Sequence, residues 1–395
     1  MRVTQISPYT AYPPQTGGEH RIHGLMSGKP GSDNVVRFAK GALSQKYSRD
    51  GDIVEINENY QEYRYRHFLE SLCSTAIKST EDVANVFTNE VLSVTRPQKL
   101  NELLEDSDVV LVEHPWQFPY VSAHTPSDTP VVYSSHNFEL SMYRDLIDSW
   151  MRPLILKQVA RLERLAVIES DLVISTTERD ARLMQDQWNT DTPFHVAPNG
   201  TTVKSNNIEC STAPDFDGDL KAIFIGNEHQ PNVRAVEQIC RIAPTVKNVD
   251  FLIVGTVCNS LTDTPPNVHL LGFVEDLEEV YAMADVGLNP IVSGGGSNVK
   301  MVEYLSYGLP VITTAFGARG LPVEDGIHCF IRDIEMFQSA VNEILEGELP
   351  VVQVSENAQE IVEEQLNWEA ISNDVFTRLH KLVESTSSKT SSASR

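Results

Sequence analysis

A glycine-rich loop that leads into a helical pattern is the part of the sequence best suited to hold a phosphate. The loop reads SGGGSN at residues 293–298, and VKMVEYL follows it. Its candidate phosphate contacts are Gly294, Gly295, Gly296, Ser297 and Asn298. Glycines let a backbone approach a ligand closely, and a helix N-terminus offers free N–H groups and positive potential. The loop therefore predicts an anion site at the start of this helix.

The first turn of that helix strengthens the prediction. Ser297 or Asn298 is suited to cap the helix, because a short polar side chain satisfies free backbone donors. The helix dipole disfavours a cation in the first turn, so Lys300 at this position indicates an anion nearby. The alternative is a flexible turn in which Lys300 and Glu303 form an ordinary surface pair.

A histidine at the end of a strand-like run is the second candidate. The run PVVYSSH ends at His136, and ligands bind at the carboxyl ends of strands in doubly wound α/β sheets. A lone histidine is also often a hydrogen-bonded structural residue, so the run by itself leaves both interpretations open.

Other motifs that bind phosphate or metal are absent or misplaced. Neither the P-loop pattern G-x-x-x-x-G-K-[ST] nor a strand followed by G-x-G-x-x-G occurs in the chain. The run DFDGD, Asp215 to Asp219, resembles a D-x-D metal motif, but it precedes a strand instead of following one. We therefore predict no metal site.

The composition disfavours several classes of function. The 395 residues carry 31 Lys and Arg against 55 Asp and Glu, a net charge of −24. This charge argues against general binding to nucleic acid or to an anionic membrane, and it fits either a salt-adapted source or an ordinary acidic enzyme. The five cysteines are scattered without C-x-x-C spacing, which predicts reduced thiols.

One segment differs from this acidic character. In MRPLILKQVARLERLAV, Lys157, Arg161 and Arg164 share one helical face at positions i, i+4 and i+7. Such a stripe is usually solvated, and the alternative is contact with an anionic membrane surface. The chain shows neither a signal peptide nor an apolar run of roughly 18 residues. We expect a cytoplasmic protein, with at most a peripheral contact at the inner face of the membrane.

Short apolar runs alternate with helical patterns along nearly the whole chain, which predicts two doubly wound α/β domains with parallel sheets. The expected strands are VTQIS, NVVRF, DIVEI, DVVLVEH, PVVYSSH, DLVIST and FHVAP in the first half, and LKAIFIG, VDFLIVG, NVHLLG, DVGLNP, PVITT and HCFI in the second. The polar segment 198–219 is the expected linker. The predicted parts are domains at 1–200 and 201–366, an amphipathic helix at 367–385 and a disordered tail at 386–395.

The stretch NVHLLGFVEDLEEVYAMADVGLNPIVSGGGSNVKMVEYLSYGLPVITTAFGARGL resembles the donor-binding part of GT-B glycosyltransferases of family 4. The order of its parts carries the resemblance: a strand ending in GFV, a helix with ADV, a short strand ending in Pro, the glycine-rich loop, K-x-x-E and GLPVITT. Other matching pieces are TGGEH, SSHNFE, DLVISTTERD, VAPNG and FIGNEHQPNVRAV. The resemblance covers almost the whole chain.

The resemblance implies two Rossmann-like domains that face each other across a cleft, with the C-terminal helix returning to the first domain. It implies a retaining glycosyltransferase that needs no metal or other cofactor. The second domain would bind a nucleotide-sugar donor, and the first would bind a saccharide or lipid-linked saccharide acceptor in glycan assembly.

The resemblance also assigns roles by matching position. The implied donor contacts are Gly17, Gly18, Phe273, Val274, Gly294, Gly295, Gly296, Ser297, Asn298, Lys300 and Glu303. Among them Lys300 contacts the diphosphate and is catalytic, and Glu303 holds the ribose hydroxyls. His136 lies beside the donor sugar as the second catalytic residue. Asn137 and Glu139, next to it, are expected to face the acceptor.

Two positions depart from the family pattern. Many members carry a glutamate eight residues before the one matching Glu303, where this chain has Gly295, so the donor sugar is open. Many also carry an arginine after the first strand of the second domain, where this chain has GNEH at 226–229. Lys300 would then carry more of the diphosphate charge alone. The alternative functions are hydrolysis or epimerisation of a nucleotide sugar, or binding without activity.

Overall fold

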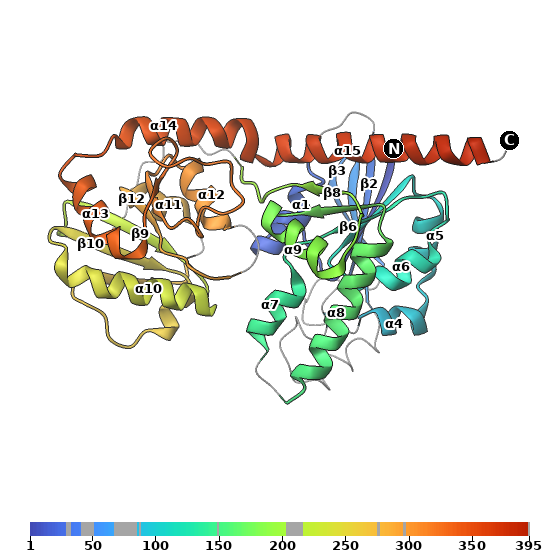
Figure 1. Ribbon diagram of the computed structural model, residues 1–395, viewed down its shortest axis with the longest axis horizontal. Coiled ribbons are helices and arrows are strands. Elements are labelled where there is room, and N and C mark those ends of the chain that lie inside the picture. The colour runs from blue at the N-terminus through green and yellow to red at the C-terminus, as the bar shows by residue number, and fades with distance from the viewer. Residues whose placement is uncertain are drawn as a thin grey trace. The chain divides into compact units, whose positions relative to one another are not determined.

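The computed structural model describes residues 1–28, 33–40, 51–66, 85–86, 88–147, 150–202, 216–274, 277–294 and 298–393. These residues form two compact units, each with one sheet between layers of helices (Figure 1). The first unit joins Met1–Pro198 to Trp368–Arg395, and the second is Asn199–Asn367.

The first unit is built on one sheet. Its described strands are β1 (Arg2–Ser7), β2 (Asn34–Lys40), β3 (Asp52–Asn57), β4 (Tyr60–Tyr65), β5 (Val109–Glu113), β6 (Val131–Ser134), β7 (Leu172–Ser175) and β8 (Phe194–Val196). They lie in the order β3-β4-β2-β1-β5-β6-β7-β8. Strand β5 is apolar on both faces: Val110 and Val112 join one core cluster, and Val109 and Leu111 join the other. Such continuous apolar strands are typical of a sheet covered on both sides.

Helices cover both faces of this sheet. They are α1 (Gly17–Gly24), α4 (Thr88–Thr95), α5 (Gln98–Glu105), α6 (Phe118–His124), α7 (Glu139–Leu146), α8 (Arg152–Glu169), α9 (Glu178–Trp188) and α15 (Trp368–Ala393). Helices α5, α6 and α8 pack on one face through residues such as Leu104, Phe118 and Leu162. Helix α15 packs on the other face through Phe376 and Leu379 (Figure 1).

Strands β3 and β4 depart from the expected all-parallel sheet. Strand β4 runs parallel to β2 but antiparallel to β3, so β3 and β4 form a hairpin at the sheet edge. The sequence YQEYRY was not predicted as a strand, because Glu62 takes an inward position. Glu62 is fully buried and pairs with Arg37 of β2 at 2.7 Å. A buried ion pair therefore replaces the apolar alternation that would have revealed the strand.

The second unit is also built on one sheet. Its described strands are β9 (Leu220–Ile225), β10 (Val249–Val254), β11 (Val268–Gly272), β12 (Val286–Asn289), β13 (Val311–Thr313) and β14 (Phe330–Ile331). They lie in the order β11-β10-β9-β12-β13-β14, and every pair is parallel. The strand order reverses at β9, because β10 and β11 lie on one side of it and β12, β13 and β14 lie on the other. Ligands bind at such a switch point, outside the carboxyl ends of the strands.

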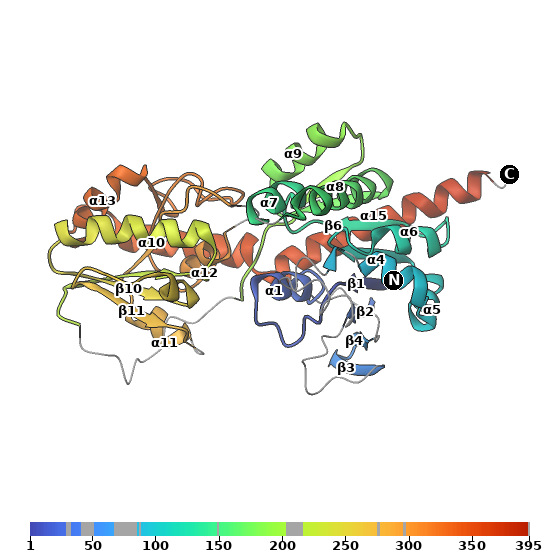
Figure 2. The same cartoon turned by 90° about the horizontal axis from the view of Figure 1, so that it is seen from below.

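Two layers of helices cover the second sheet. They are α10 (Gln230–Ile242), α11 (Leu277–Met283), α12 (Val299–Ser306), α13 (Phe337–Leu345) and α14 (Val351–Ile361). Figure 2 shows α10 and α13 on one side of β10 and β11, with α11 on the other. Val236 and Val341 belong to the core beneath α10 and α13, and Tyr304 and Leu305 belong to the core beneath α12.

Helix α15 returns the end of the chain to the first unit, as the resemblance implied. The ring of Trp368 packs against Gly24 so closely that a Cβ there would lie 2.2 Å from it. The helix continues to Ala393, through much of the segment for which the composition predicted a disordered tail. Hydroxyls of this segment donate to carbonyls one turn back, as Thr386 does to Leu382 at 3.0 Å. None of the described helices has the length and apolar character to cross a bilayer.

Candidate active site

Glu113 and His136 come together at the carboxyl edge of the first sheet. Glu113 ends β5, and His136 follows the neighbouring strand β6. His136 Nε2 lies 2.9 Å from Glu113 Oε2, and both side chains are buried. Burial and the nearby His114 lower the pKa of His136 to about 3. Burial also acts to raise the pKa of Glu113, but the hydrogen bonds that it accepts, above all from His136, outweigh burial and leave that pKa below its ordinary value.

These pKa directions define the protonation near neutral pH. Glu113 is a carboxylate and His136 is a neutral imidazole. Nε2 of His136 therefore carries the ring proton and donates a hydrogen bond to the Glu113 carboxylate. Nδ1 of His136 is then a hydrogen-bond acceptor. It lies 3.9 Å from the position of a Cβ on Gly18. A neutral acceptor nitrogen thus faces the start of α1.

A second histidine, His114, lies at the same edge and was not predicted as a site residue from the sequence. Its ring contacts that of His136, with centroids 3.9 Å apart and the two planes tilted by 33°. Its Nδ1 lies 2.9 Å from Glu139 Oε1, and its Nε2 lies 3.2 Å from the Tyr9 hydroxyl. The backbone of His114 has a φ of +63°, which is rare for a residue with a side chain and is concentrated at functional sites. The signal was present, because DVVLVEH ends on a histidine in the same way as PVVYSSH.

Glu139, which was expected to face an acceptor, is fully buried at the first position of α7. Its carboxylate is bound to His114, and its backbone N–H donates to Glu163 at 2.7 Å. Burial and the charge of Glu139 raise the pKa of Glu163 well above its ordinary value. Asn137 is half-buried and more accessible than Glu139. The Glu139 carboxylate therefore acts on the site through its hydrogen bond to His114.

Gly17 and Gly18 are the first residues of α1. Thr16 caps this helix, and its side chain and that of Glu19 form a reciprocal capping box. A Cβ on Gly18 would lie 2.6 Å from the hydroxyl oxygen of Tyr9. Any side chain at position 18 would displace Tyr9, which is bonded to His114. The glycine is required here by close packing, next to the two histidines.

A buried polar network supports Glu113 from inside the sheet. Gln5 of β1 donates from Nε2 to Glu113 Oε1 at 2.7 Å. Arg37 of β2 in turn donates from Nε to Gln5 Oε1 at 3.0 Å. These residues come from three strands, so no spacing in the sequence could reveal them as a set. The network fixes the carboxylate that orients His136.

The glycine-rich loop lies at the carboxyl edge of the second sheet, after β12. Gly294 has a φ of +126°, a conformation that favours glycine. Gly295, Gly296 and Ser297 lie outside the described residues. Asn298 occupies the N-cap position of α12, but its side chain makes no capping bond. It donates instead from Nδ2 to Asn289 Oδ1 at 2.8 Å, which ties the loop to the end of β12.

Lys300 and Glu303 do not pair with each other. Lys300 Nζ donates to Asn232 Oδ1 at 2.7 Å and lies 4.0 Å from the centre of the Phe224 ring. Glu303 Oε2 accepts from the Tyr281 hydroxyl at 2.9 Å. Burial lowers the pKa of Lys300 to about 7, although Glu303 acts to raise it. The structure therefore does not support the alternative of an ordinary surface pair.

Asn232 and Arg319 are two further polar residues at this edge that the sequence did not reveal. Asn232 donates from Nδ2 to Asn227 Oδ1 at 2.7 Å, so it joins Lys300 to the loop after β9. Arg319 Nη2 lies 3.9 Å from the position of a Cβ on Gly294. Its Nη1 donates to the carbonyl of Phe316 at 2.7 Å, and its guanidinium lies over the Phe316 ring. An arginine is thus present beside the glycine-rich loop, although not after β9.

The residues expected near a nucleoside lie at the same edge. Tyr281, which binds Glu303, stacks on Tyr307 with ring centroids 4.1 Å apart. Phe273 directly follows β11, and its side chain is 74% exposed. Val274 is half-buried beside it.

The histidines and carboxylates of the described residues, including those around His136, are not arranged as metal ligands. No group of three or more His, Cys, Asp or Glu residues in the described part of the chain is arranged to hold a metal ion. Of the run DFDGD, Asp215 lies outside the described residues. Gly218 packs against Asp250, which accepts its N–H at 2.7 Å.

Comparisons with known proteins agree with this fold. Residues 219–347 match the family described as glycosyl transferases group 1. No curated protein sequence matches the chain. Sucrose-phosphate synthase from Thermosynechococcus elongatus superposes with a TM-score of 0.69 at 14% identity, over 98% of this chain and 100% of that one. HepE from Anabaena in complex with UDP and glucose superposes with a TM-score of 0.63 at 16% identity, over 96% of this chain and 100% of that one.

The two α/β units and the full-length structural matches show the GT-B fold, so the fold predicted from the sequence is confirmed. The match to the glycosyl transferases group 1 family adds the activity: the protein is a glycosyltransferase of the kind that uses nucleotide-sugar donors. Residues 219–347, which contain most of the second unit, form a domain of the glycosyl transferases group 1 family.

Proposed function

We propose that the protein is a retaining glycosyltransferase that transfers a sugar to a saccharide or a lipid-linked saccharide without needing a metal ion. The observation that carries the proposal is Lys300. Lys300 is half-buried at the start of α12, where the hydrogen-bond partner of its ammonium is the neutral amide of Asn232. A cation with a pKa lowered by burial becomes more stable when an anion binds beside it. The donor diphosphate is that anion.

Arg319 is the second cation for the same diphosphate in this proposal. The arginine expected after β9 is missing, and Arg319 approaches Gly294 from the segment that follows β13. Phe316 already holds its guanidinium through a carbonyl and a ring, so the side chain loses little freedom when an anion binds. Lys300, Arg319 and the free N–H groups of α12 then share the negative charge.

These groups act most strongly on the transition state. Breaking the bond between sugar and diphosphate builds positive charge on the sugar ring and negative charge on the departing phosphate. Donors already aimed at that phosphate lower the barrier. Retention proceeds by attack of the acceptor hydroxyl on the face that the phosphate leaves, and the departing phosphate accepts the hydroxyl proton. The alternative is a covalent intermediate, which needs a free carboxylate. Glu113 and Glu139 are unsuited to that role, because each is buried and bound to a histidine.

His136 orients a substrate in this proposal and does not remove a proton. A general base works best when its pKa lies near the working pH, and the pKa of His136 is about 3. Its Nδ1 is a fixed neutral acceptor, which suits a hydrogen bond from a sugar hydroxyl. Asn137, the more accessible neighbour, is the better candidate for contact with the acceptor.

A donor screen tests the proposal. The purified chain is mixed with UDP-, GDP- and ADP-linked sugars, and its melting temperature is measured, because a ligand that binds only the folded state raises stability. UDP-glucose is the first donor to try, since a trehalose-6-phosphate structure from E. coli and the HepE structure contain UDP ligands. The donor that binds is then offered a panel of saccharide acceptors, and the anomeric configuration of the product is determined by NMR.

Each outcome decides between functions. An α-linked product from an α-linked donor supports the proposal. Rapid donor turnover without an acceptor would show a hydrolase or epimerase. Donor binding without turnover across the whole acceptor panel would show a binding protein.

A further inference from the structure

The exposed face of helix α8 combines cations with large apolar side chains. Lys157, Arg161 and Arg164 are all exposed, and Leu154 and Ile168 extend the same face toward the two ends of the helix. At 100° per residue these five positions fall within an arc of about 80°. The cations predicted to share a face therefore do so, and the face also has an apolar part that the charge pattern did not indicate.

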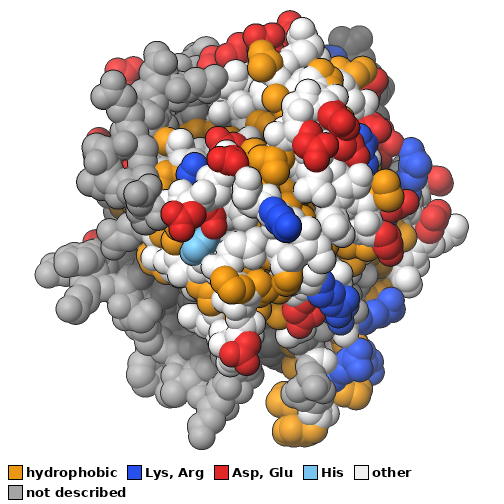
Figure 3. Space-filling view, turned by 90° about the vertical axis from the view of Figure 1, so that its left-hand side faces the viewer, with side chains coloured by type: hydrophobic (Ala, Val, Ile, Leu, Met, Phe, Trp, Pro, Cys, Tyr) orange, Lys and Arg blue, Asp and Glu red, His pale blue; other side chains and the backbone are white. Residues whose placement is uncertain are grey.

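The apolar part is concentrated where α8 begins. Trp150, one residue before the helix cap, is 90% exposed, and Leu154 is 57% exposed. Ile168, at the other end, is 38% exposed. At the lower edge of Figure 3, at the height where α8 begins in Figure 1, hydrophobic side chains lie next to Lys and Arg side chains. Tryptophan beside cations is the composition of a segment that lies in the interface of a bilayer.

The charge of this face is opposite to that of the chain as a whole. Between Met151 and Ile168 the single acidic residue is Glu163, which is fully buried and bound to the start of α7. Within the described residues, Lys157, Arg161 and Arg164 form no ion pair with a carboxylate. The net charge of the whole chain is −24. A face with exposed charges of one sign in such a chain is complementary to an anionic surface.

We propose that this face of α8, together with Trp150, docks the protein on a membrane that contains anionic phospholipid. Trp150 and Leu154 enter the interface, and Lys157, Arg161 and Arg164 contact the lipid phosphates. The net negative charge does not prevent docking, because charges farther than the Debye length of about 10 Å at 0.1 M salt are largely screened. The inference does not depend on the donor or the acceptor, so it can fail while the proposed reaction stands.

Vesicle flotation tests the docking. The intact chain is mixed with vesicles of phosphatidylcholine alone, or of phosphatidylcholine with an equal amount of phosphatidylglycerol. We expect binding to the anionic vesicles that weakens as salt is added, and no binding to the neutral vesicles. Exchanging Lys157, Arg161 and Arg164 together for alanine should weaken the binding on the order of 100-fold, because each surface cation contributes about fivefold. No binding of the wild type to anionic vesicles at about 0.1 M salt, where distant charges are screened, would overturn the proposal.

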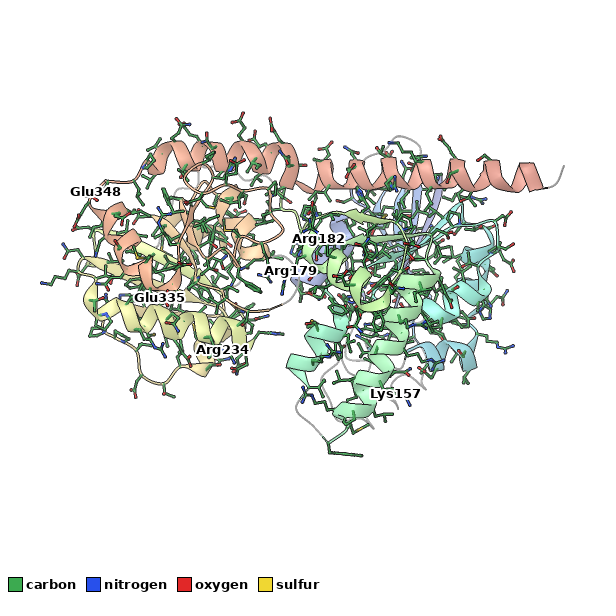
Figure 4. All side chains as sticks on the ribbon, in the orientation of Figure 1. Lys157, Arg179, Arg182, Arg234, Glu335 and Glu348 are labelled. Atoms are coloured by element: carbon green, nitrogen blue, oxygen red, sulfur yellow. The ribbon has the colours of Figure 1, made fainter. Side chains whose placement is uncertain are left out.

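A matched control variant distinguishes an effect of the α8 face from an effect of net charge. Arg182, Arg241 and Lys247 are exposed cations elsewhere on the chain, and their triple alanine variant changes the net charge by the same amount. Figure 4 labels Lys157 on α8 and Arg182 on α9, two different helices of the first unit. The control should bind anionic vesicles as the wild type does. Equal losses in the two triple variants would show a general charge effect and overturn the proposal.

Tryptophan fluorescence tests the apolar part separately. Trp150 is far more exposed than Trp116, Trp188 and Trp368. Anionic vesicles should shift the emission of the wild type to shorter wavelength, and Trp150→Phe should lose that shift while it keeps most of the binding. A shift of equal size in Trp150→Phe would show that this residue does not enter the lipid.

Discussion

The two sheet edges that carry candidate site residues are built in different ways. At the edge of the first sheet each histidine already has a carboxylate, His136 with Glu113 and His114 with Glu139. At the edge of the second sheet the half-buried cation Lys300 is bonded to the neutral amide of Asn232. The first edge is thus complete without a ligand, whereas the second gains most from an added anion. This difference predicts that substitutions in the first unit will affect stability and orientation, and that those in the second will affect donor binding and rate.

The largest expected effect is that of Lys300→Ala. Loss of one donor aimed at the leaving group should lower kcat/KM by roughly 10²- to 10³-fold. The melting temperature should not fall, because partial desolvation of the ammonium costs the folded state free energy. Kinetics with the best donor and thermal denaturation measure the two effects. Lys247→Ala, at an exposed site of the same unit, is the control. Equal activity of the two variants would place the diphosphate elsewhere.

Arg319→Ala should have the next largest effect. The variant loses the hydrogen bonds from a charged guanidinium to the diphosphate. Binding of UDP or of the nucleotide sugar should therefore weaken about 10- to 100-fold. Calorimetric titration measures the change, and Arg319→Lys should restore part of the affinity because it keeps the charge but not the planar fork. Unchanged affinity in Arg319→Ala would show that Lys300 and the backbone hold the diphosphate without it.

At the first edge, Glu113→Gln should act mainly on stability. The amide cannot serve as a charged acceptor for both Gln5 and His136, and a buried polar group left without its partner costs about 1–3 kcal/mol. Urea denaturation measures the loss, with Glu105→Gln on the exposed side of α5 as control. Nitrogen NMR of the imidazole should also show a change in the proton position of His136. Wild-type stability together with an unchanged spectrum would contradict the proposed tautomer.

The smallest effect is a pH dependence of donor binding. The pKa of free Lys300 is about 7, and a bound diphosphate should raise it, so binding above pH 7 takes up a proton. Affinity for UDP should be level below pH 7 and fall by at most about tenfold per pH unit above it. Lys300→Arg stays charged and should remove this dependence. A wild-type affinity that is constant from pH 6 to pH 9 would contradict the lowered pKa.

Lys300 also determines how the stability of the unliganded protein changes with pH. The folded pKa of Lys300, about 7, lies below the ordinary value of 10.5. Between these two pH values the unfolded chain binds more protons than the folded one, so this residue makes stability rise with pH over that window. Lys300→Met should lack this contribution when urea denaturation is compared at pH 7 and pH 9.

The sequence revealed most of the elements and part of the site. Apolar runs at strand spacing marked nearly all strands of both sheets, because continuous apolar strands are what a doubly covered sheet requires. Strand β4 was missed because Glu62 is paired with Arg37 inside the sheet. The glycine-rich loop was recognisable because its residues are consecutive. Arg319 and Asn232 were not, because only the folded sheet brings them to Gly294 and Lys300.

The return of α15 to the first unit has a consequence for how the chain folds as it is synthesised. One face of the first sheet, with Val3, Leu111 and Ile174, is covered by Phe376 and Leu379 near the end of the chain. That face stays partly uncovered on the ribosome until α15 has been made, although its strands emerge first. The second unit is one continuous segment and can close its core earlier. The unit made first is therefore completed last, and during synthesis its apolar surface is the part of the protein most exposed to aggregation and to chaperones.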